Sequence, residues 1–182
     1  MQRELAEATP PPWRSSGPVE IGGCFVCFAG ERAFAAAALS EEAAIVAGTA
    51  GAPYEPGLLA LREGPLLEAA VRALPRRPDV LLVNATGRDH PRRAGLALHL
   101  GAVLDLPTVG VTQRPLCSPE DVRWLTTKPG RRPFAVHAGW RTDLETAVEV
   151  VSATVAGFRT PAPIRIARRL ARLARARNAA WS

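Results

Sequence analysis

Aromatic side chains, lysine and cysteine are all scarce in this chain of 182 residues. Aromatic residues make up only 5% of it, so Ala, Leu and Val must supply most of any core. Lys128 is the only lysine among 23 basic residues. Cys24, Cys27 and Cys117 show no disulfide pattern. Cys24 and Cys27 fall in an apolar run typical of a strand, where side chains three residues apart face opposite sides and cannot share a metal. The sequence therefore predicts ordinary buried thiols in a reduced protein.

Long apolar runs are also missing. No stretch of 18 apolar residues appears, and the N-terminus lacks the apolar region of a secretion signal. We therefore expect no membrane partner and a cytoplasmic location. The length suits one sizeable core rather than two full domains. Residues 1–18 look like a short helical start followed by Pro, Ser and Gly, which predicts a loose N-terminal arm (1–18) and a single domain (19–182).

The charge is strongly basic, with a net charge of +6 and a pI of about 10.5. Such a balance favours an anionic partner, with nucleic acid as the first candidate. The alternative is a solubilising surface in an arginine-biased proteome, and it stays open. Near the C-terminus, spacings of three and four residues predict one broad basic helical face, which either contacts phosphates or is simply solvated. Its members are Arg165, Arg168, Arg169, Arg172 and Arg175.

The order of elements predicts an α/β fold. Short apolar runs between turn residues predict strands, and apolar positions at helical spacing predict helices. The expected strands are 19–29, 33–39, 43–47, 79–84, 107–113 and 131–139. The expected helices are 61–74, 91–105, 141–157 (with Thr142 as N-cap and Gly157 as C-cap) and 162–180. An antiparallel meander followed by parallel strands, all covered by helices, fits a ribonuclease H-like mixed sheet.

Four stretches carry motifs in a fixed order along the chain. "PYEPGLLALREGP" (53–65) and "LLVNATGRDHPRRAGLALHLGAVLDLPTVGVTQ" (81–113) are the longest and most specific. "FAVHAGWRTDLETAV" (134–148) and "FRTPAPIRIA" (158–167) follow. These stretches resemble the P-Y-I-P-G-F-L-x-F-R-E-G-P, V-D-G-x-G-x-x-H-P-R, V-S-x-G-H-R and R-x-P-E-P-T-R-x-A motifs of the endonuclease V family. The resemblance covers roughly residues 20 to 170.

This resemblance implies a protein that acts on DNA or RNA, deaminated or single-stranded, near bases such as hypoxanthine. It implies Mg²⁺ as cofactor, because phosphodiester hydrolysis needs an activated water and a stabilised leaving oxygen. The implied catalytic residues are Glu63 and His90, and the implied metal ligands are Glu63 and, weakly, Asn84. The residues implied to open the strand and to shape a base pocket are Pro53, Tyr54, Pro56, Gly57, Leu59, Gly87 and Gly95. For the glycines, a role in turns and in helix–sheet packing stays open.

The chain departs from the family pattern at its chemical centre. Two acid positions hold Phe25 and Asn84, and the lysine position holds Gln113. A His and a Glu of the later motifs are replaced by Trp140 and Ala162. Mg²⁺ requires hard oxygen ligands, so we expect it to bind poorly. We also expect Glu63, Asn84, Phe25 and Gln113 to converge at the carboxyl end of the central strands.

Three other residues bear on this site. Asp89 is either a compensating metal ligand, a solvated loop residue or the cap of the helix near residue 91. His99 is expected to be a packed or capping residue, and His137 has no partner that the sequence can identify. Three functions remain open: a nuclease-derived module that binds altered or single-stranded nucleic acid without cutting, which we favour; an active endonuclease with a rebuilt metal site; and a partner subunit with neither activity.

Overall fold

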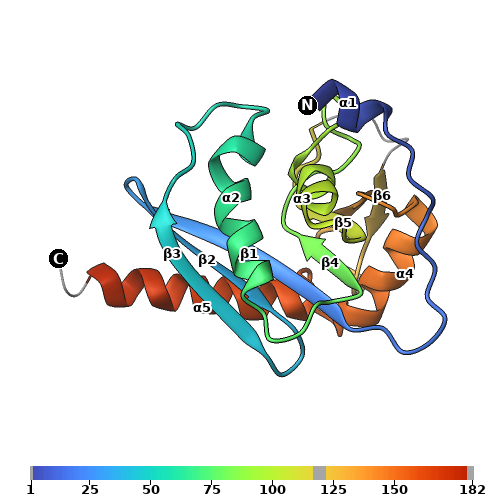
Figure 1. Cartoon of the computed structure of the whole chain (residues 1–182). Coiled ribbons are helices and arrows are strands. Elements are labelled where there is room, and N and C mark those ends of the chain that lie inside the picture. Colours follow the sequence, from blue (N-terminus) through green and yellow to red (C-terminus); the bar gives the residue numbers. More distant parts are fainter. Residues whose placement is uncertain (1, 117–121, 180–182) are drawn as a thin grey trace.

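The computed structural model describes residues 2–116 and 122–179 (Figure 1). Cys117 lies outside these residues. The helices are α1 (Gln2–Glu7), α2 (Leu59–Arg72), α3 (Leu96–Leu104), α4 (Leu144–Val155) and α5 (Ala162–Ala179). The strands are β1 (Ile21–Ala29), β2 (Arg32–Ala38), β3 (Ala43–Thr49), β4 (Val80–Val83), β5 (Thr108–Thr112), β6 (Val122–Leu125) and β7 (Phe134–Ala138).

One seven-stranded sheet runs through the molecule in the order β3-β2-β1-β4-β5-β7-β6. Strands β1, β2 and β3 form an antiparallel meander, and β4 and β5 continue parallel to β1. Strands β7 and β6 then pair antiparallel beyond β5. The predicted mixed sheet is confirmed. Strand β6 was not predicted, because Arg123 and Trp124 are exposed and leave no apolar run in "VRWL".

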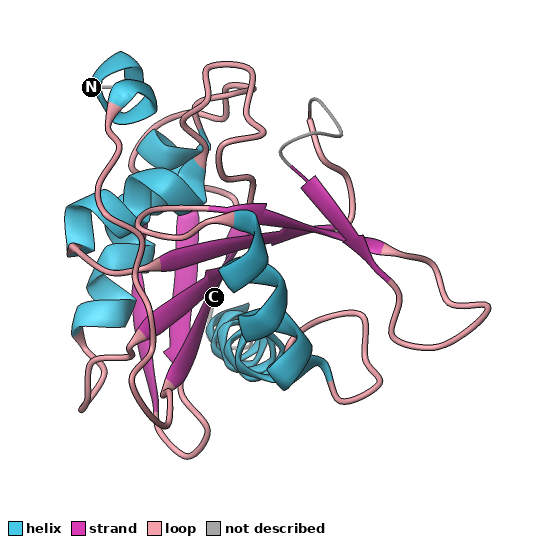
Figure 2. Ribbon diagram, turned by 90° about the vertical axis from the view of Figure 1, so that its right-hand side faces the viewer, coloured by secondary structure: helices cyan, strands magenta, loops and turns pink. Residues whose placement is uncertain are grey.

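Helices cover both faces of this sheet (Figures 1 and 2). On one face, α2 and α3 pack over β1 and β4, where Cys24 and Val83 meet Leu67 and Leu100. On the other face, α5 runs along β1 and β2, with Ala167 and Ala171 against the sheet. Small alanine side chains on β2 and α5 let this helix lie close to the strands. No helix in residues 2–116 and 122–179 is long and apolar enough to cross a membrane.

Two helix starts differ from the prediction. Helix α3 begins at Leu96 rather than near residue 91, because residues 91–95 form turns in which Arg93 has a φ of 51°. Helix α4 is capped by Asp143, whose carboxylate accepts a hydrogen bond from the Thr146 N–H at 2.8 Å. Thr142 cannot cap, because its hydroxyl accepts from the Gly139 N–H and donates to the Thr108 carbonyl oxygen. At the other end of α4, Ala156 takes the left-handed C-cap conformation one residue before Gly157.

The N-terminal residues 2–18 contact the domain at several points. The Trp13 N–H donates to the carbonyl oxygen of Arg141 at 2.7 Å, and Arg14 pairs with Asp143 at 2.5 Å. The Arg88 guanidinium donates to two carbonyl oxygens at the end of α1, those of Ala6 and Ala8. These bonds carry α1 across the surface towards α3. The division into an arm and a single domain stays a prediction.

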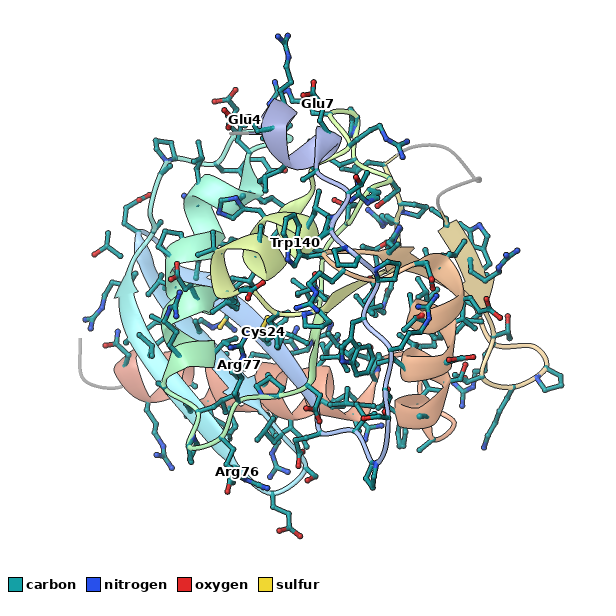
Figure 3. All side chains as sticks on the ribbon, turned by 45° about the vertical axis from the view of Figure 1, so that its right-hand side comes forward. Glu4, Glu7, Cys24, Arg76, Arg77 and Trp140 are labelled. Carbon is teal, nitrogen blue, oxygen red and sulfur yellow. The ribbon has the colours of Figure 1, made fainter. Side chains whose placement is uncertain are left out.

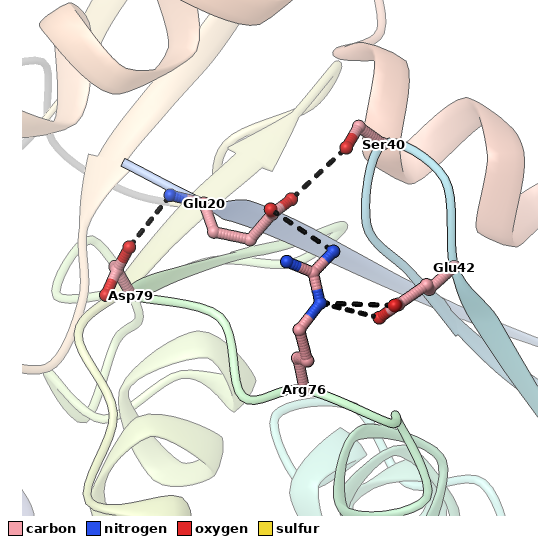
Figure 4. Close-up of polar contacts among 5 residues, drawn as sticks. All are labelled: Glu20, Ser40, Glu42, Arg76 and Asp79. Atoms are coloured by element: carbon pink, nitrogen blue, oxygen red, sulfur yellow. Dashed lines mark hydrogen bonds and ion pairs between the residues drawn. The ribbon is translucent and has the colours of Figure 1, made fainter. Parts of the chain in front are cut away.

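A polar network holds the amino ends of β1 and β4 together (Figure 4). Asp79 accepts from the Glu20 N–H at 2.8 Å, and Arg76 lies 3.1 Å from Glu42 and 3.8 Å from Glu20. The Ser40 hydroxyl also donates to Glu20. Exposed ion pairs stabilise a fold only weakly. The network therefore contributes mainly by fixing the relative positions of β1, the β2–β3 turn and the segment that enters β4.

Candidate nucleic-acid interface

Glu63 is a half-buried acid on α2. It lies near Cys24 of β1, whose position in the interior appears in Figure 3. Burial raises the pKa of Glu63 to about 7, although the neighbouring Arg62 guanidinium lowers it. Burial, and then the Glu63 carboxylate, raise the pKa of the Cys24 thiol well above its usual range.

Phe25 and Asn84 stand side by side at the carboxyl end of β4. Cys24 pairs with Val83 in the parallel register of β1 and β4, so the next residue on each strand is Phe25 or Asn84. Arg168 of α5 joins them. Its guanidinium donates to Asn84 Oδ1 at 3.2 Å, and its central carbon lies 5.0 Å from the centroid of the Phe25 ring. Two of the positions singled out from the sequence are thus brought together, around a cation of the protein itself.

This place does not fit Mg²⁺. The ion needs several hard oxygen ligands, and here it would meet an aromatic ring and one amide oxygen that already accepts from Arg168. The guanidinium adds a positive charge. Within residues 2–116 and 122–179, no cluster of three or more His, Cys, Asp and Glu side chains could hold a metal ion.

The other predicted members of the chemical centre are spread along the sheet. Gln113 is exposed and follows β5, which runs parallel to β4. Gln113 and Asn84 therefore follow strands that end at the same edge of the sheet. Trp140 follows the antiparallel β7 and lies at the opposite end of β5. There its backbone N–H donates to the Thr108 hydroxyl at 2.9 Å. Its side chain stands against Gly101 of α3 (Figure 3). Convergence of Glu63 and Gln113 on Phe25 and Asn84 stays a prediction.

Three of the implied pocket residues and the implied catalytic His90 line one small cavity. Gly57, Leu59, His90 and Gly95 surround a space of about 30 Å³ between the loop before α2 and the loop before α3. A tight turn presents Gly57: the Leu58 N–H bonds to the Glu55 carbonyl oxygen, and Gly57 has a φ of 80°. Such a volume holds about two waters, far less than the several hundred Å³ of ordinary ligand pockets.

Gln2 of α1 closes this cavity. Its Nε2 lies 3.3 Å from the carbonyl oxygen of Gly57 and 3.4 Å from that of Ala94, and it donates to both. Its Oε1 accepts from the Arg92 guanidinium at 3.0 Å. The Gln2 amide therefore hydrogen-bonds to the two carbonyl oxygens that the edge of a bound base would otherwise contact.

His90 holds the two loops together. Its Nδ1 accepts from the Arg92 N–H at 3.1 Å, and the His90 ring also hydrogen-bonds to the backbone of Gly57. Burial and then the charge of Arg92 lower the pKa of His90, so the ring is neutral at neutral pH. These contacts give His90 a role in positioning the loops before α2 and α3. Its implied catalytic role stays a prediction.

The implied glycines and the exposed tip have different surroundings. A Cβ at Gly87 would lie 2.1 Å from the Ala138 carbonyl oxygen, and one at Gly95 would lie 2.4 Å from that of Thr86. Gly87 thus lets the loop after β4 lie against the end of β7, and Gly95 lets the start of α3 lie against that loop. Both are packing roles, and Gly95 also borders the cavity. Pro53, Tyr54 and Pro56 are exposed at the tip, with Tyr54 67% exposed.

A buried polar chain was missed by the sequence reasoning. Asp89 is 1% exposed, so it is neither a solvated loop residue nor a cap of α3, whose N-cap is Gly95. Its Oδ1 accepts from the Gly87 N–H at 2.9 Å and lies 2.8 Å from His137 Nδ1. The His137 Nε2 lies 3.0 Å from the Thr112 hydroxyl. No local pattern links Asp89 to His137, because only the pairing of β7 with β5 brings them together.

The basic face of α5 includes a shallow groove of about 350 Å³, lined by Arg165, Arg168, Arg169, Arg172 and Leu173. The Arg165 guanidinium lies 3.8 Å from the centroid of the Phe158 ring. No carboxylate in the described part of the chain pairs with these four arginines. The groove is therefore a patch of uncompensated positive charge.

Comparisons with known proteins agree on one family. The family model described as Endonuclease V matches residues 23–169. An endonuclease V from Roseiflexus sp. (strain RS-1) is 40% identical over 138 residues, covering 65% of this chain and 62% of that protein. The chain thus spans less than two thirds of the length of this relative.

Solved structures agree with the family match. A crystal structure of the endonuclease V from Streptomyces avermitilis superposes with a TM-score of 0.85 at 33% identity, over 100% of this chain and 92% of that one. The Ciona intestinalis endonuclease V, in complex with a DNA containing an inosine, superposes with a TM-score of 0.79 at 24% identity, over 97% and 95%. The predicted ribonuclease H-like fold is confirmed.

Proposed function

The chain belongs to the endonuclease V family, and from that premise we propose that it binds nucleic acid at deaminated bases while having weak or lost metal-dependent cleavage. The partner is DNA or RNA with an altered base such as hypoxanthine, presented in a single-stranded or opened segment. Nucleic acid containing inosine is what the Ciona relative holds in its complex.

The observation that carries the proposal is the cavity shared by Gly57, Leu59, His90 and Gly95, which would admit a base once the Gln2 side chain moves out of it. It lies behind the exposed tip of Pro53, Tyr54 and Pro56. An extruded base is read by a close-fitting pocket and by stacking on apolar or aromatic side chains. The +6 net charge supports the backbone part of such binding.

The weak-cleavage part of the proposal depends on the metal position. Nucleases of this family are in general metal-dependent, and Mg²⁺ is the ion that the sequence motifs imply. The replacement of two acids by Phe25 and Asn84 removes ligands, and Arg168 supplies a competing charge at the same place. We therefore propose that Mg²⁺ binds poorly here.

The test separates binding from cleavage. Labelled single strands of DNA and of RNA, each with one inosine or one adenine at the same position, are titrated with the protein in Mg²⁺, Mn²⁺ or EDTA. Fluorescence anisotropy measures binding, and denaturing gels measure nicking. We expect preferential binding of inosine strands, a steep loss of affinity with added salt, and little nicking. Equal affinity for both bases, or affinity that is flat in salt, would remove the proposal.

The alternative is an active Mg²⁺-dependent endonuclease with a rebuilt site. One observation favours it: Glu63 is retained as a half-buried acid beside the sheet. It predicts nicking of the inosine strand at an ordinary enzymatic turnover, abolished in Glu63→Ala. A cytoplasmic location is proposed as well, because Cys24 and Cys27 are free thiols, which suits a reducing compartment.

A further inference from the structure

Arg168 is held in place by two uncharged partners. Its guanidinium faces the ring of Phe25 and donates to the side-chain oxygen of Asn84. A cation over an aromatic face is attracted by the ring without losing its charge. An amide oxygen likewise accepts a hydrogen bond without neutralising the donor. The pair therefore orients the guanidinium and leaves its positive charge unbalanced.

The surroundings increase this imbalance. Arg168 is only partly exposed, and its Nε is buried with no hydrogen-bond partner in the described residues. Burial, and then the charge of Arg172, lower the pKa of Arg168. Arg165, one turn earlier on α5, has a buried Nη1 without a partner among these residues and lies over Phe158. Unpaired buried donors are costly, so each is an opening for a ligand that accepts hydrogen bonds.

We propose that Arg168 takes the place of a divalent metal ion, and that with Arg165, Arg169 and Arg172 it forms a metal-independent site for a phosphate of the nucleic-acid backbone. This inference rests on the proposed function and names the chemistry that holds its ligand. Guanidinium groups match phosphate oxygens through paired N–H donors. A phosphate in the groove of α5 would meet several cations that no carboxylate in the described part of the chain neutralises.

The same arrangement explains why Phe25 and Asn84 occur together. A carboxylate at either position would form an ion pair with Arg168 and cancel the charge that attracts phosphate. An aromatic ring and a neutral amide orient a guanidinium, whereas a metal site needs anionic oxygens. The two replacements that weaken a metal site are thus the two that an arginine site requires.

The alternative interpretation, a basic face that is simply solvated, explains only some of the arginines of α5. Arg169, Arg172 and Arg175 are exposed, as that reading requires. Arg168 is different, because its Nε is buried and its partners lie on β1 and after β4. Solvation alone gives no reason to desolvate this guanidinium beside other arginines.

The experiment compares Arg168→Gln with Arg177→Gln, a matched loss of charge on the last turn of the same helix outside the groove. Binding of an inosine-containing single strand is measured in EDTA and in Mg²⁺ over a salt series. We expect wild-type affinity to be the same in EDTA and Mg²⁺. Arg168→Gln should bind about tenfold more weakly and reduce the salt slope by about one, with a smaller effect for Arg177→Gln. Affinity that requires Mg²⁺, or an equal effect of the two variants, would overturn the inference.

Two further arms keep the test decisive. Inorganic phosphate should raise the melting temperature of wild type and Arg177→Gln more than that of Arg168→Gln, and this readout remains if no strand binds. If no strand binds but phosphate still stabilises wild type more than Arg168→Gln, the proposed function is rejected and the phosphate site is kept. If Arg168→Gln and Arg177→Gln differ neither in strand affinity nor in stabilisation by phosphate, the phosphate site is rejected. Asn84→Asp should weaken strand binding in EDTA through its ion pair with Arg168. A gain in EDTA would contradict us, and this variant also serves if Arg168→Gln does not fold.

Discussion

The Nδ1 atom of His137 lies 2.8 Å from Oδ1 of Asp89, and both side chains are almost wholly buried. The same carboxylate oxygen accepts from the Gly87 N–H, and so ties the loop after β4 to strand β7. Residues of two separate motifs thus share one polar contact beneath the surface, and the placement of the loop that ends at the cavity depends on it.

Asp89→Ala should lower the free energy of unfolding by about 2–4 kcal/mol, because it leaves the His137 Nδ1 and the Gly87 N–H buried without a partner. Urea denaturation measures this. His137→Ala and the double variant complete a cycle, in which the double variant should cost clearly less than the sum of the two single changes. Additive losses would show that the two side chains do not interact.

Gln2→Glu should increase the preference for inosine over adenine strands. A carboxylate of the same size cannot donate to the carbonyl oxygens of Gly57 and Ala94, so it should turn away from them towards the Arg92 guanidinium and leave both oxygens free for a base. The inosine-to-adenine affinity ratio is the readout, because the added charge weakens binding to both strands alike. An unchanged ratio would mean that Gln2 does not compete with the base.

The chain should show little or no Mg²⁺-dependent cleavage, because Phe25, Asn84 and Gln113 remove groups on which phosphoryl transfer depends. Losing one such group commonly costs on the order of 10²–10³ in rate. Phe25→Asp, Asn84→Asp and Gln113→Lys, alone and combined, test this by gel assay, with melting curves to detect misfolding. Combination with Arg168→Ala should be needed for any recovery, since the guanidinium repels the ion. Efficient nicking by the unmodified chain, lost in Glu63→Ala, would contradict the prediction.

Protonation of the Asp143 carboxylate should lower the stability of the protein in acid. Although burial raises its pKa, hydrogen bonds from Thr146 and Arg14 hold the pKa at about 2, below its ordinary value of 3.8. Its contribution is therefore complete above about pH 4 and is lost as the pH falls towards 2. Since the side chain is 37% exposed, we expect only about 1 kcal/mol. Asp143→Asn keeps an N-cap, so its unfolding free energy should lack this step between pH 4 and pH 2. An identical pH profile for the variant would contradict the assignment.

The sequence by itself determined the class of fold and most of its elements. Apolar runs and helical spacing are local properties, so they were enough to predict β1 to β5, β7 and the four long helices. They failed where local signals are weak or overridden: β6 has two adjacent exposed residues, and the Thr142 hydroxyl donates to a carbonyl oxygen distant in sequence. The ordered motifs were enough to predict the family and to single out four of the residues that line the cavity.

Only the tertiary structure decided what surrounds those residues. The Arg168 guanidinium, the Gln2 amide and the His137 ring each reach their partners across tens of residues of sequence, from α5, α1 and β7. Such contacts depend on sheet register and on how a helix lies across the strands, which periodicity does not encode. For that reason the sequence could predict a weakened metal site at Phe25 and Asn84, but not that the guanidinium of Arg168 contacts both of them.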